Sequence, residues 1–122
     1  MKTLVTAIGR EKMAKARAGL ITLAPIVQMA LGNGGAEDGV EKTPQETGLY
    51  NEIIRKDISS VTAVTQTTYR YEIILQEDEL AGETISESAL YDADGDCVAV
   101  LTCLPKQKDA GAQIVWQMSD QF

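Results

Sequence analysis

Three aspartates at alternate positions, Asp92, Asp94 and Asp96, form the clearest cluster of chemically active side chains in the sequence. Carboxylate oxygens spaced in this way can wrap around a calcium ion, which prefers several oxygen ligands. The pattern departs from the calcium-binding EF-hand loop, because Gly95 falls too early and Cys103 stands where the closing glutamate belongs. The sequence therefore favours a solvated hairpin turn at this place, with a weak cation site as the alternative.

Other patterns that could carry chemistry are incomplete. The sequence has no histidine, so it lacks the commonest general base and a common zinc ligand. Residues 32–35 form a glycine-rich loop, but neither a phosphate-binding lysine nor the glycine spacing of a dinucleotide site accompanies it. Residues 77–79 and Glu83 are acidic and could supply a catalytic carboxylate pair, although acidic loops are usually solvated. We therefore predict no catalytic residues, no enzyme activity and no cofactor.

Cys97 and Cys103 lie on the same face of an expected strand. At a rise of about 3.3 Å per residue, their Cα atoms would be about 20 Å apart. A disulfide needs Cα atoms within about 7 Å of each other. The two cysteines are therefore expected to be free thiols that serve as small apolar side chains of the core.

The composition limits the class of protein. Of the 122 residues, 44% are apolar, which is enough for one buried core, so we expect a single domain over residues 1–122. The net charge of −7 argues against nucleic-acid binding, because phosphate contacts need a basic face. No apolar stretch approaches the ~20 residues of a membrane helix, and no signal-peptide pattern is visible. We therefore expect the protein to be synthesised into the cytoplasm and to have no membrane partner.

Hydrophobic periodicity predicts one helix near the N-terminus. Residues 3–18 carry apolar side chains at helical spacing, with Thr3 or Thr6 as the N-cap. Gly19 stands where helices often end with a left-handed residue. The helix must pack against the elements that follow, since it cannot bury its apolar side alone.

The rest of the chain is typical of strands joined by polar loops. Strands are expected at residues 23–31, 58–68, 68–75, 84–91, 96–104 and 113–118. The pair around residues 92–96 is predicted as a hairpin, and alternation in residues 69–75 predicts one core-facing side. Residues 32–47 form a long loop, and residues 49–56 are ambiguous between turn and strand. The expected fold class is α+β, with the N-terminal helix packed on a mostly antiparallel β-sheet or small β-sandwich.

Four segments follow one another along the chain: LVTAIGREKMAKA at residues 4–16, VQMALGNGG at 27–35, LYNEIIRKDI at 49–58 and ISESALYDADGD at 85–96. Together they resemble the N-terminal domain of phage tail fibres, the tail-collar fibre family. The sequence departs from the family pattern at Asp57, where proline is usual, and at Ala89, where glycine is usual.

The resemblance implies a structural component of a phage or prophage-derived tail, similar to the module that attaches tail fibres to the baseplate. Its partners would be other tail or baseplate proteins, and a homotrimer is one assembly that the resemblance implies. Such a protein is cytoplasmic during assembly and then part of the virion or a phage-like particle. The alternative function is a small ligand- or cation-binding module with no catalytic role.

Asn51, Glu52, Arg55 and Lys56 are the polar residues that we expect to bind a partner. In one interpretation these side chains contact a neighbouring subunit. In the other they brace the long loop back onto the domain. The sequence leaves both interpretations open.

Overall fold

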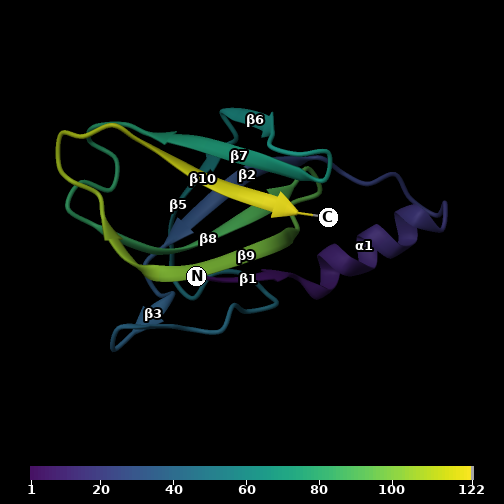
Figure 1. Cartoon of the computed structure of the whole chain (residues 1–122), viewed down its shortest axis with the longest axis horizontal. Helices are drawn as coiled ribbons and strands as arrows, with labels where there is room; N and C mark the ends of the chain where they lie inside the picture. Colours follow the sequence, from purple (N-terminus) through teal and green to yellow (C-terminus); the bar gives the residue numbers. More distant parts are fainter. Residues whose placement is uncertain (122) are drawn as a thin grey trace.

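A computed structural model describes residues 1–121, and about half of them form antiparallel strands, with one short helix near the N-terminus (Figure 1). The elements are β1 (Lys2–Val5), α1 (Ala7–Arg17), β2 (Ile26–Gly32), β3 (Ala36–Glu37), β4 (Val40–Glu41), β5 (Glu52–Asp57), β6 (Ser60–Ala63), β7 (Thr68–Leu75), β8 (Thr84–Asp92), β9 (Cys97–Gln107) and β10 (Ile114–Gln121). This content agrees with the predicted α+β class. Within the described residues, no helix has the length and apolarity needed to span a membrane.

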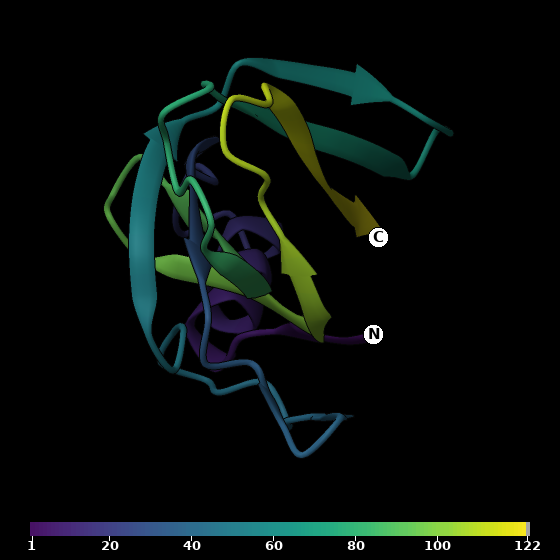
Figure 2. The ribbon, with the colours of Figure 1, turned by 90° about the vertical axis from the view of Figure 1, so that its left-hand side faces the viewer.

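The strands form two main sheets and one small hairpin. The five-stranded sheet has the order β1-β9-β8-β2-β5, and the three-stranded sheet has the order β10-β7-β6. Every pairing is antiparallel, and β3 pairs only with β4 in the long loop. The three-stranded sheet lies above the five-stranded sheet in both ribbon views (Figures 1 and 2).

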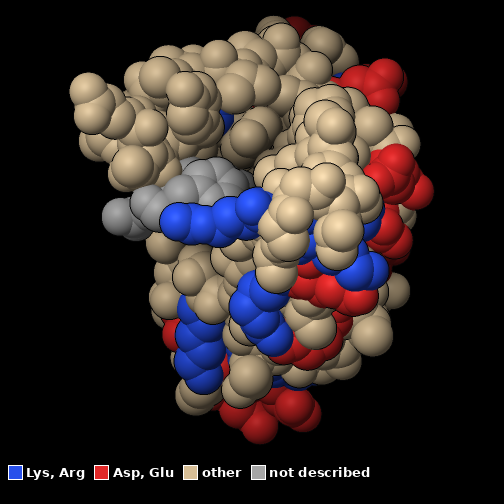
Figure 3. Space-filling view, turned by 90° about the vertical axis from the view of Figure 1, so that its right-hand side faces the viewer, with Lys and Arg blue, Asp and Glu red and all other residues tan. Residues whose placement is uncertain are grey.

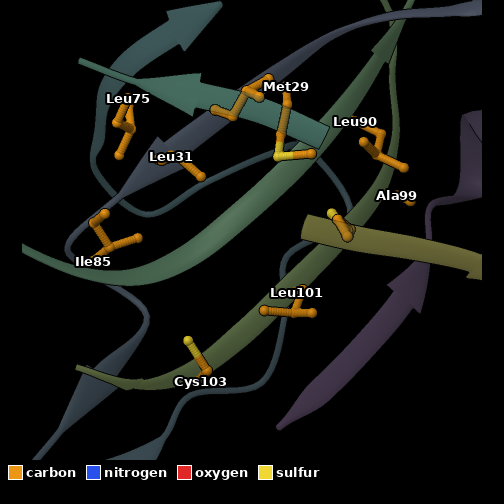
Figure 4. Close-up of a cluster of buried hydrophobic side chains, with 10 residues drawn as sticks. Met29, Leu31, Leu75, Ile85, Leu90, Ala99, Leu101 and Cys103 are labelled. Carbon is orange, nitrogen blue, oxygen red and sulfur yellow. The ribbon is translucent and has the colours of Figure 1, made fainter. Parts of the chain in front are cut away.

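The main core cluster joins the two sheets (Figure 4). Its buried members are Met29, Leu31, Ile73, Leu75, Ile85, Leu90, Ala99, Leu101, Cys103 and Met118. Alternate residues of a strand point to one face, which explains why β2, β7 and β9 each contribute residues two apart. The core-facing side predicted for β7 is confirmed only in its second half. Tyr69 is 41% exposed, because the hairpin tip between β6 and β7 projects beyond the five-stranded sheet (Figure 2).

The N-terminal helix is shorter than predicted. Residues Lys2–Val5 pair with β9 as strand β1, so α1 begins only at Ala7. Thr6 is the N-cap, and its hydroxyl accepts a hydrogen bond from the Gly9 backbone N–H at 3.1 Å. The predicted left-handed residue after the helix is confirmed at Gly19, where φ is 79°.

The closest backbone contact between the helix and the sheet is made at a glycine. Gly9 is the one residue of α1 that is buried, and a Cβ atom there would lie 2.6 Å from the carbonyl oxygen of Val98. The rest of α1 extends away from the sheets (Figure 1). The helix therefore makes its buried contact with the five-stranded sheet through its first turn.

Two further boundaries differ from the sequence prediction. β9 continues to Gln107 through Pro105, where a loop was expected. The proline is tolerated because the β8–β9 register shifts between Ile85 and Glu87, opposite this part of β9. The ambiguous residues 49–56 contain the start of β5, and the strand expected at residues 58–68 ends at Ala63 before the turn into β7.

Both cysteines are free and buried, as predicted. Burial raises the pKa of the Cys97 thiol to about 11, and it also raises the pKa of Cys103. We expect Ellman's reagent to react with native Cys97 about a hundredfold more slowly than with the unfolded chain, and with native Cys103 also more slowly, because the thiolate is the reactive form. Absorbance of the released thiolate, with and without denaturant, measures both rates. Native thiols that react as fast as unfolded ones would contradict this burial.

Candidate functional site

A buried carboxylate anchors the long loop that precedes β5. Glu87 of β8 is completely buried, and no lysine or arginine is bonded to it in the described part of the chain. Its Oε1 accepts a hydrogen bond from the Tyr50 backbone N–H at 2.8 Å. Its Oε2 accepts two more, from the backbone N–H groups of Gly34 and Asn51, each at 2.9 Å. Three backbone donors therefore satisfy the charge, and both ends of the loop are tied to one side chain.

The glycines of this loop are required by the close approach of β8. A Cβ atom at Gly35 would lie 2.1 Å from the backbone oxygen of Ser86. At Gly32 it would lie 2.5 Å from the Glu87 carboxylate. The glycine-rich stretch that resembled a phosphate cradle thus packs directly on β8, and Glu87 occupies the position where an anion would have to sit.

Further polar contacts hold the rest of the loop. The Ser86 hydroxyl accepts a hydrogen bond from the Gly35 N–H at 2.9 Å. The Tyr50 hydroxyl donates to the Thr43 carbonyl at 2.6 Å, and the Lys42 ammonium lies 4.6 Å from the centre of the Tyr50 ring. The loop that the sequence predicted as long and polar is therefore ordered, because hydrogen bonds and a cation–π contact hold it at several points along its length.

Asn51 and Lys56 both connect β5 to neighbouring segments. The Asn51 amide donates to the side-chain oxygen of Asn33 at 2.6 Å, across the two ends of the loop. The Lys56 ammonium donates to the Ile74 carbonyl at 2.6 Å and pairs with Glu79. The Lys56 ammonium also lowers the pKa of the Glu79 carboxyl below its ordinary value. These contacts match the bracing interpretation for two of the four residues.

Glu52 and Arg55 form a surface ion pair on β5. The Arg55 guanidinium donates to both carboxylate oxygens of Glu52, at 3.2 and 2.7 Å, and lies 3.7 Å from the centre of the Tyr91 ring. The hydrogen bonds to Glu52 raise the pKa of Arg55. Both side chains remain about one-third exposed. Because β5 is an edge strand of the five-stranded sheet, this pair and Asn51 lie beside a free backbone edge. Partner binding by these residues stays a prediction.

The carboxylates of Asp92, Asp94 and Asp96 surround one ammonium group. The Nζ atom of Lys12, on α1, lies 2.6, 3.0 and 2.6 Å from their oxygens, respectively. Asp92 is the buried member, and its other oxygen accepts hydrogen bonds from the Asp94 and Asp96 backbone N–H groups, both at 3.0 Å. The three aspartates do converge, as a cation site requires, but Lys12 lies among them.

The electrostatics of this cluster favour a charged lysine. Burial acts to lower the pKa of Lys12, but the hydrogen bonds to Asp92, Asp96 and Asp94 outweigh it and raise the pKa above its ordinary value. The cluster ties the projecting helix α1 to the β8–β9 turn. A metal ion would have to displace a protonated ammonium to bind there.

The remaining acidic residues do not converge. Glu79 pairs with Lys56, and Glu83 is exposed. Among residues 1–121, the aspartate trio is the one group of three acidic or cysteine side chains close enough to share an ion. The acidic residues 77–79 and Glu83 therefore offer no second ion-binding group of three within the described part of the chain.

Three structurally important residues were not recognised from the sequence. They are Glu87, Lys12 and Lys108, the last of which is fully buried and donates to the carbonyls of Gln76 and Glu77 at 2.8 and 3.2 Å. For Glu87 a signal existed, because this acid stood between the apolar residues Ile85 and Ala89 in the alternation of an expected strand. The partners of Lys12 and Lys108 come from distant segments, which local patterns do not reveal.

The described residues form a β-rich fold with an anchored loop and a charged strand edge. The family model described as phage tail-collar fibre protein, N-terminal, matches residues 1–118. The chain therefore belongs to the phage tail-collar fibre family, as the four segments indicated. Membership indicates a structural role in a phage tail, in association with other tail proteins, as part of the virion. Searches of curated proteins and of solved structures found no match.

Proposed function

We propose that this chain is an attachment module that joins a tail fibre to the baseplate or tail tip of a phage or phage-like particle. The observation that carries the proposal is the family match, which covers residues 1–118 of the 122-residue chain. The convergent carboxylates of Asp92, Asp94 and Asp96 bind the Lys12 ammonium, which is consistent with a structural use of this cluster.

The exposed edge of β5 is the attachment surface that we favour. The loop before it is held by Glu87, so Asn51, Glu52 and Arg55 are presented by a rigid backbone. A preorganised surface loses little conformational freedom when it binds, which favours affinity. Lys56 supports this surface from behind through Ile74 and Glu79. Under this proposal Lys56 braces the surface, and the other three residues contact the partner.

A charge swap separates partner contact from bracing. In the double variant Glu52→Arg/Arg55→Glu, the ion pair within the chain can form again, while the charges shown to a partner are reversed. Because the swap also removes the Arg55 guanidinium from the Tyr91 ring, we expect a small loss of thermal stability with the fold retained, and loss of co-purification with tail proteins encoded beside this gene. The matched control is Glu11→Lys/Lys15→Glu, which swaps an exposed ion pair on α1 and should leave binding intact. If the wild-type chain binds none of these tail proteins, the proposal fails.

Calcium binding is the second candidate, and the convergence of Asp92, Asp94 and Asp96 is the observation in its favour. Because the Lys12 ammonium lies among these carboxylates, we expect millimolar calcium to leave the melting temperature of the wild-type protein unchanged. Differential scanning fluorimetry with calcium, and with magnesium as the control, measures this. A rise in melting temperature specific to calcium would support a cation-binding module instead.

A further inference from the structure

Asn33 and Gly34 form an adjacent pair that is chemically reactive when the chain around it is flexible. In an Asn-Gly sequence the backbone nitrogen of the glycine can attack the side-chain amide carbon of the asparagine, because glycine has no Cβ atom to hinder the approach. The chain has one other asparagine, Asn51, which is followed by the larger residue Glu52. Asn33 is therefore the asparagine whose local sequence favours this reaction.

The reaction is a spontaneous deamidation. The Gly34 nitrogen gives up its proton and forms a bond to Cγ of Asn33, while the bond from Cγ to Nδ2 breaks and ammonia leaves, so that a cyclic imide closes. Water then opens the imide at either of its carbonyl carbons. The product is an aspartate, or an isoaspartate in which the main chain runs through the former side chain. Overall, one water is consumed and one ammonia is released.

Packing requires the glycine of this pair. A Cβ atom at Gly34 would lie 2.7 Å from Cβ of Tyr50 and 3.1 Å from the backbone nitrogen of Asn51. A larger residue would push these closely packed segments apart, so the fold keeps a reactive Asn-Gly sequence in the loop. Protection of Asn33 must therefore come from the way in which the folded loop holds the reacting atoms.

Hydrogen bonds hold both groups that would have to react. The Gly34 N–H, whose nitrogen is the attacking atom, donates to Oε2 of Glu87 at 2.9 Å. The side-chain oxygen of Asn33 accepts a hydrogen bond from the Asn51 amide at 2.6 Å. The backbone N–H of Asn33 donates to the Asn51 carbonyl at 3.1 Å. The nitrogen and the amide carbon that must meet are therefore tied to different partners.

The charge of Glu87 opposes the first step of the reaction. The Gly34 nitrogen must lose its proton before it attacks, and a nearby negative charge disfavours a group that becomes an anion. Glu87 is completely buried, so water screens this repulsion only weakly. The carboxylate therefore keeps the Gly34 N–H protonated, as a hydrogen-bond donor.

We propose that Asn33 is a latent site of spontaneous deamidation, which the hydrogen bond from Gly34 to Glu87 keeps unreactive as long as the loop is closed. The reaction proceeds only when the loop opens locally and Gly34 leaves the carboxylate. An isoaspartate adds one carbon atom to the main chain beside Gly34, so the three backbone donors no longer fit Glu87 together. Because the ammonia is lost, an opening of the loop becomes a permanent chemical change.

The product also carries an unfavourable charge. The chain already has a net charge of −7, and acidic side chains lie along the right-hand side and at the lower end of the face in Figure 3. A further carboxylate at residue 33 adds to this repulsion, and it stands next to the amide that is bonded to Glu87. The deamidated chain is therefore expected to melt at a lower temperature than the intact chain. This inference does not depend on fibre attachment.

The test follows Asn33 by peptide mass spectrometry of the full chain, incubated at mildly alkaline pH either native or unfolded in guanidinium chloride. Asn51 is the internal reference in the same digest, since Glu52 follows it. We expect deamidation of Asn33 to be about a hundredfold slower in the native protein than in the unfolded chain, because the attack requires the loop to open. Equal rates in the two states would overturn the proposal.

Glu87→Gln separates protection by the carboxylate from catalysis by it. We expect the folded variant to deamidate at Asn33 about tenfold faster than the wild type, because the charge that holds the Gly34 N–H is gone. Glu83→Gln, at an exposed position, is the matched control and should keep the wild-type rate. Circular dichroism confirms that each variant is folded. An unchanged or slower rate in Glu87→Gln would overturn the proposal, and a slower rate would identify Glu87 as the base that activates Gly34.

The wild type alone supplies a second measurement. Guanidinium chloride below the unfolding transition increases local opening, so hydrogen exchange at the Gly34 amide and deamidation of Asn33 should accelerate in parallel. Deamidation that proceeds quickly while the Gly34 amide remains protected from exchange would contradict control of this site by Glu87.

Discussion

Replacement of Glu87 by glutamine is expected to lower the free energy of unfolding by about 3 kcal/mol. The buried carboxylate accepts backbone hydrogen bonds from Gly34, Tyr50 and Asn51. Glutamine removes the charge from all three bonds and turns an N–H group toward at least one donor, which is left without an acceptor. Urea denaturation measures the stability, and hydrogen exchange at these three amides should accelerate in the variant.

The control for this change is Glu83→Gln, which makes the same substitution at an exposed position just before the same strand. It should alter stability by less than about 0.5 kcal/mol. Equal effects of the two variants would show that Glu87 does not anchor the loop. A large loss of stability with unchanged exchange at Tyr50 and Asn51 would show that Glu87 supports some other part of the fold.

Replacement of Lys12 by methionine is the second change with a large expected effect, a loss of about 2 kcal/mol. Methionine keeps the apolar stem but removes the ammonium from among three carboxylates. Asp92, whose side chain is only 2% exposed, would lose its cationic partner, whereas Asp94 and Asp96 are solvated and contribute less. Urea denaturation near neutral pH measures the loss. Lys15→Met, in an exposed ion pair with Glu11, should cost less than about 0.5 kcal/mol.

The contribution of Lys12 to the free energy of unfolding is expected to depend on pH in the alkaline range. Because the folded protein raises the pKa of Lys12, its contribution is fully present below the ordinary lysine value of 10.5 and is lost as the pH rises through the higher folded value. The stability difference between the wild type and Lys12→Met should therefore be constant near neutrality and shrink above about pH 10.5. A difference that does not change across this range would mean that the ion pairs contribute little.

Local patterns predicted those elements whose partners are close in sequence. The β8–β9 hairpin follows from the Asp-Gly turn between two apolar runs, and β7 follows from alternation over residues 68–75. Thr6 and Gly19 marked the helix boundaries because capping depends on adjacent backbone groups. In each case the residues that determine the structure lie within a few positions of one another.

The features that local patterns missed depend on contacts between residues that are far apart in the sequence. Residues Lys2–Val5 are compatible with a helix, and they become a strand only because β9 offers an edge from the far end of the chain. The role of Glu87 depends on amides that the folded loop brings to it, and that of Lys12 depends on a turn about 80 residues later. Partner binding by Asn51, Glu52, Arg55 and Lys56 stays a prediction, and which of these side chains brace the loop became visible only in the three-dimensional contacts.

The central claim is that this chain is a structural part of a phage tail. The most direct test is quantitative mass spectrometry of gradient-purified tail or phage-like particles from cells that carry this gene, with a strain lacking the gene as the control. The account predicts that the chain co-sediments with baseplate and fibre proteins in a fixed ratio, and that particles from the deletion strain lack attached fibres. Absence of the chain from purified particles, with fibres still attached in the deletion strain, would contradict it.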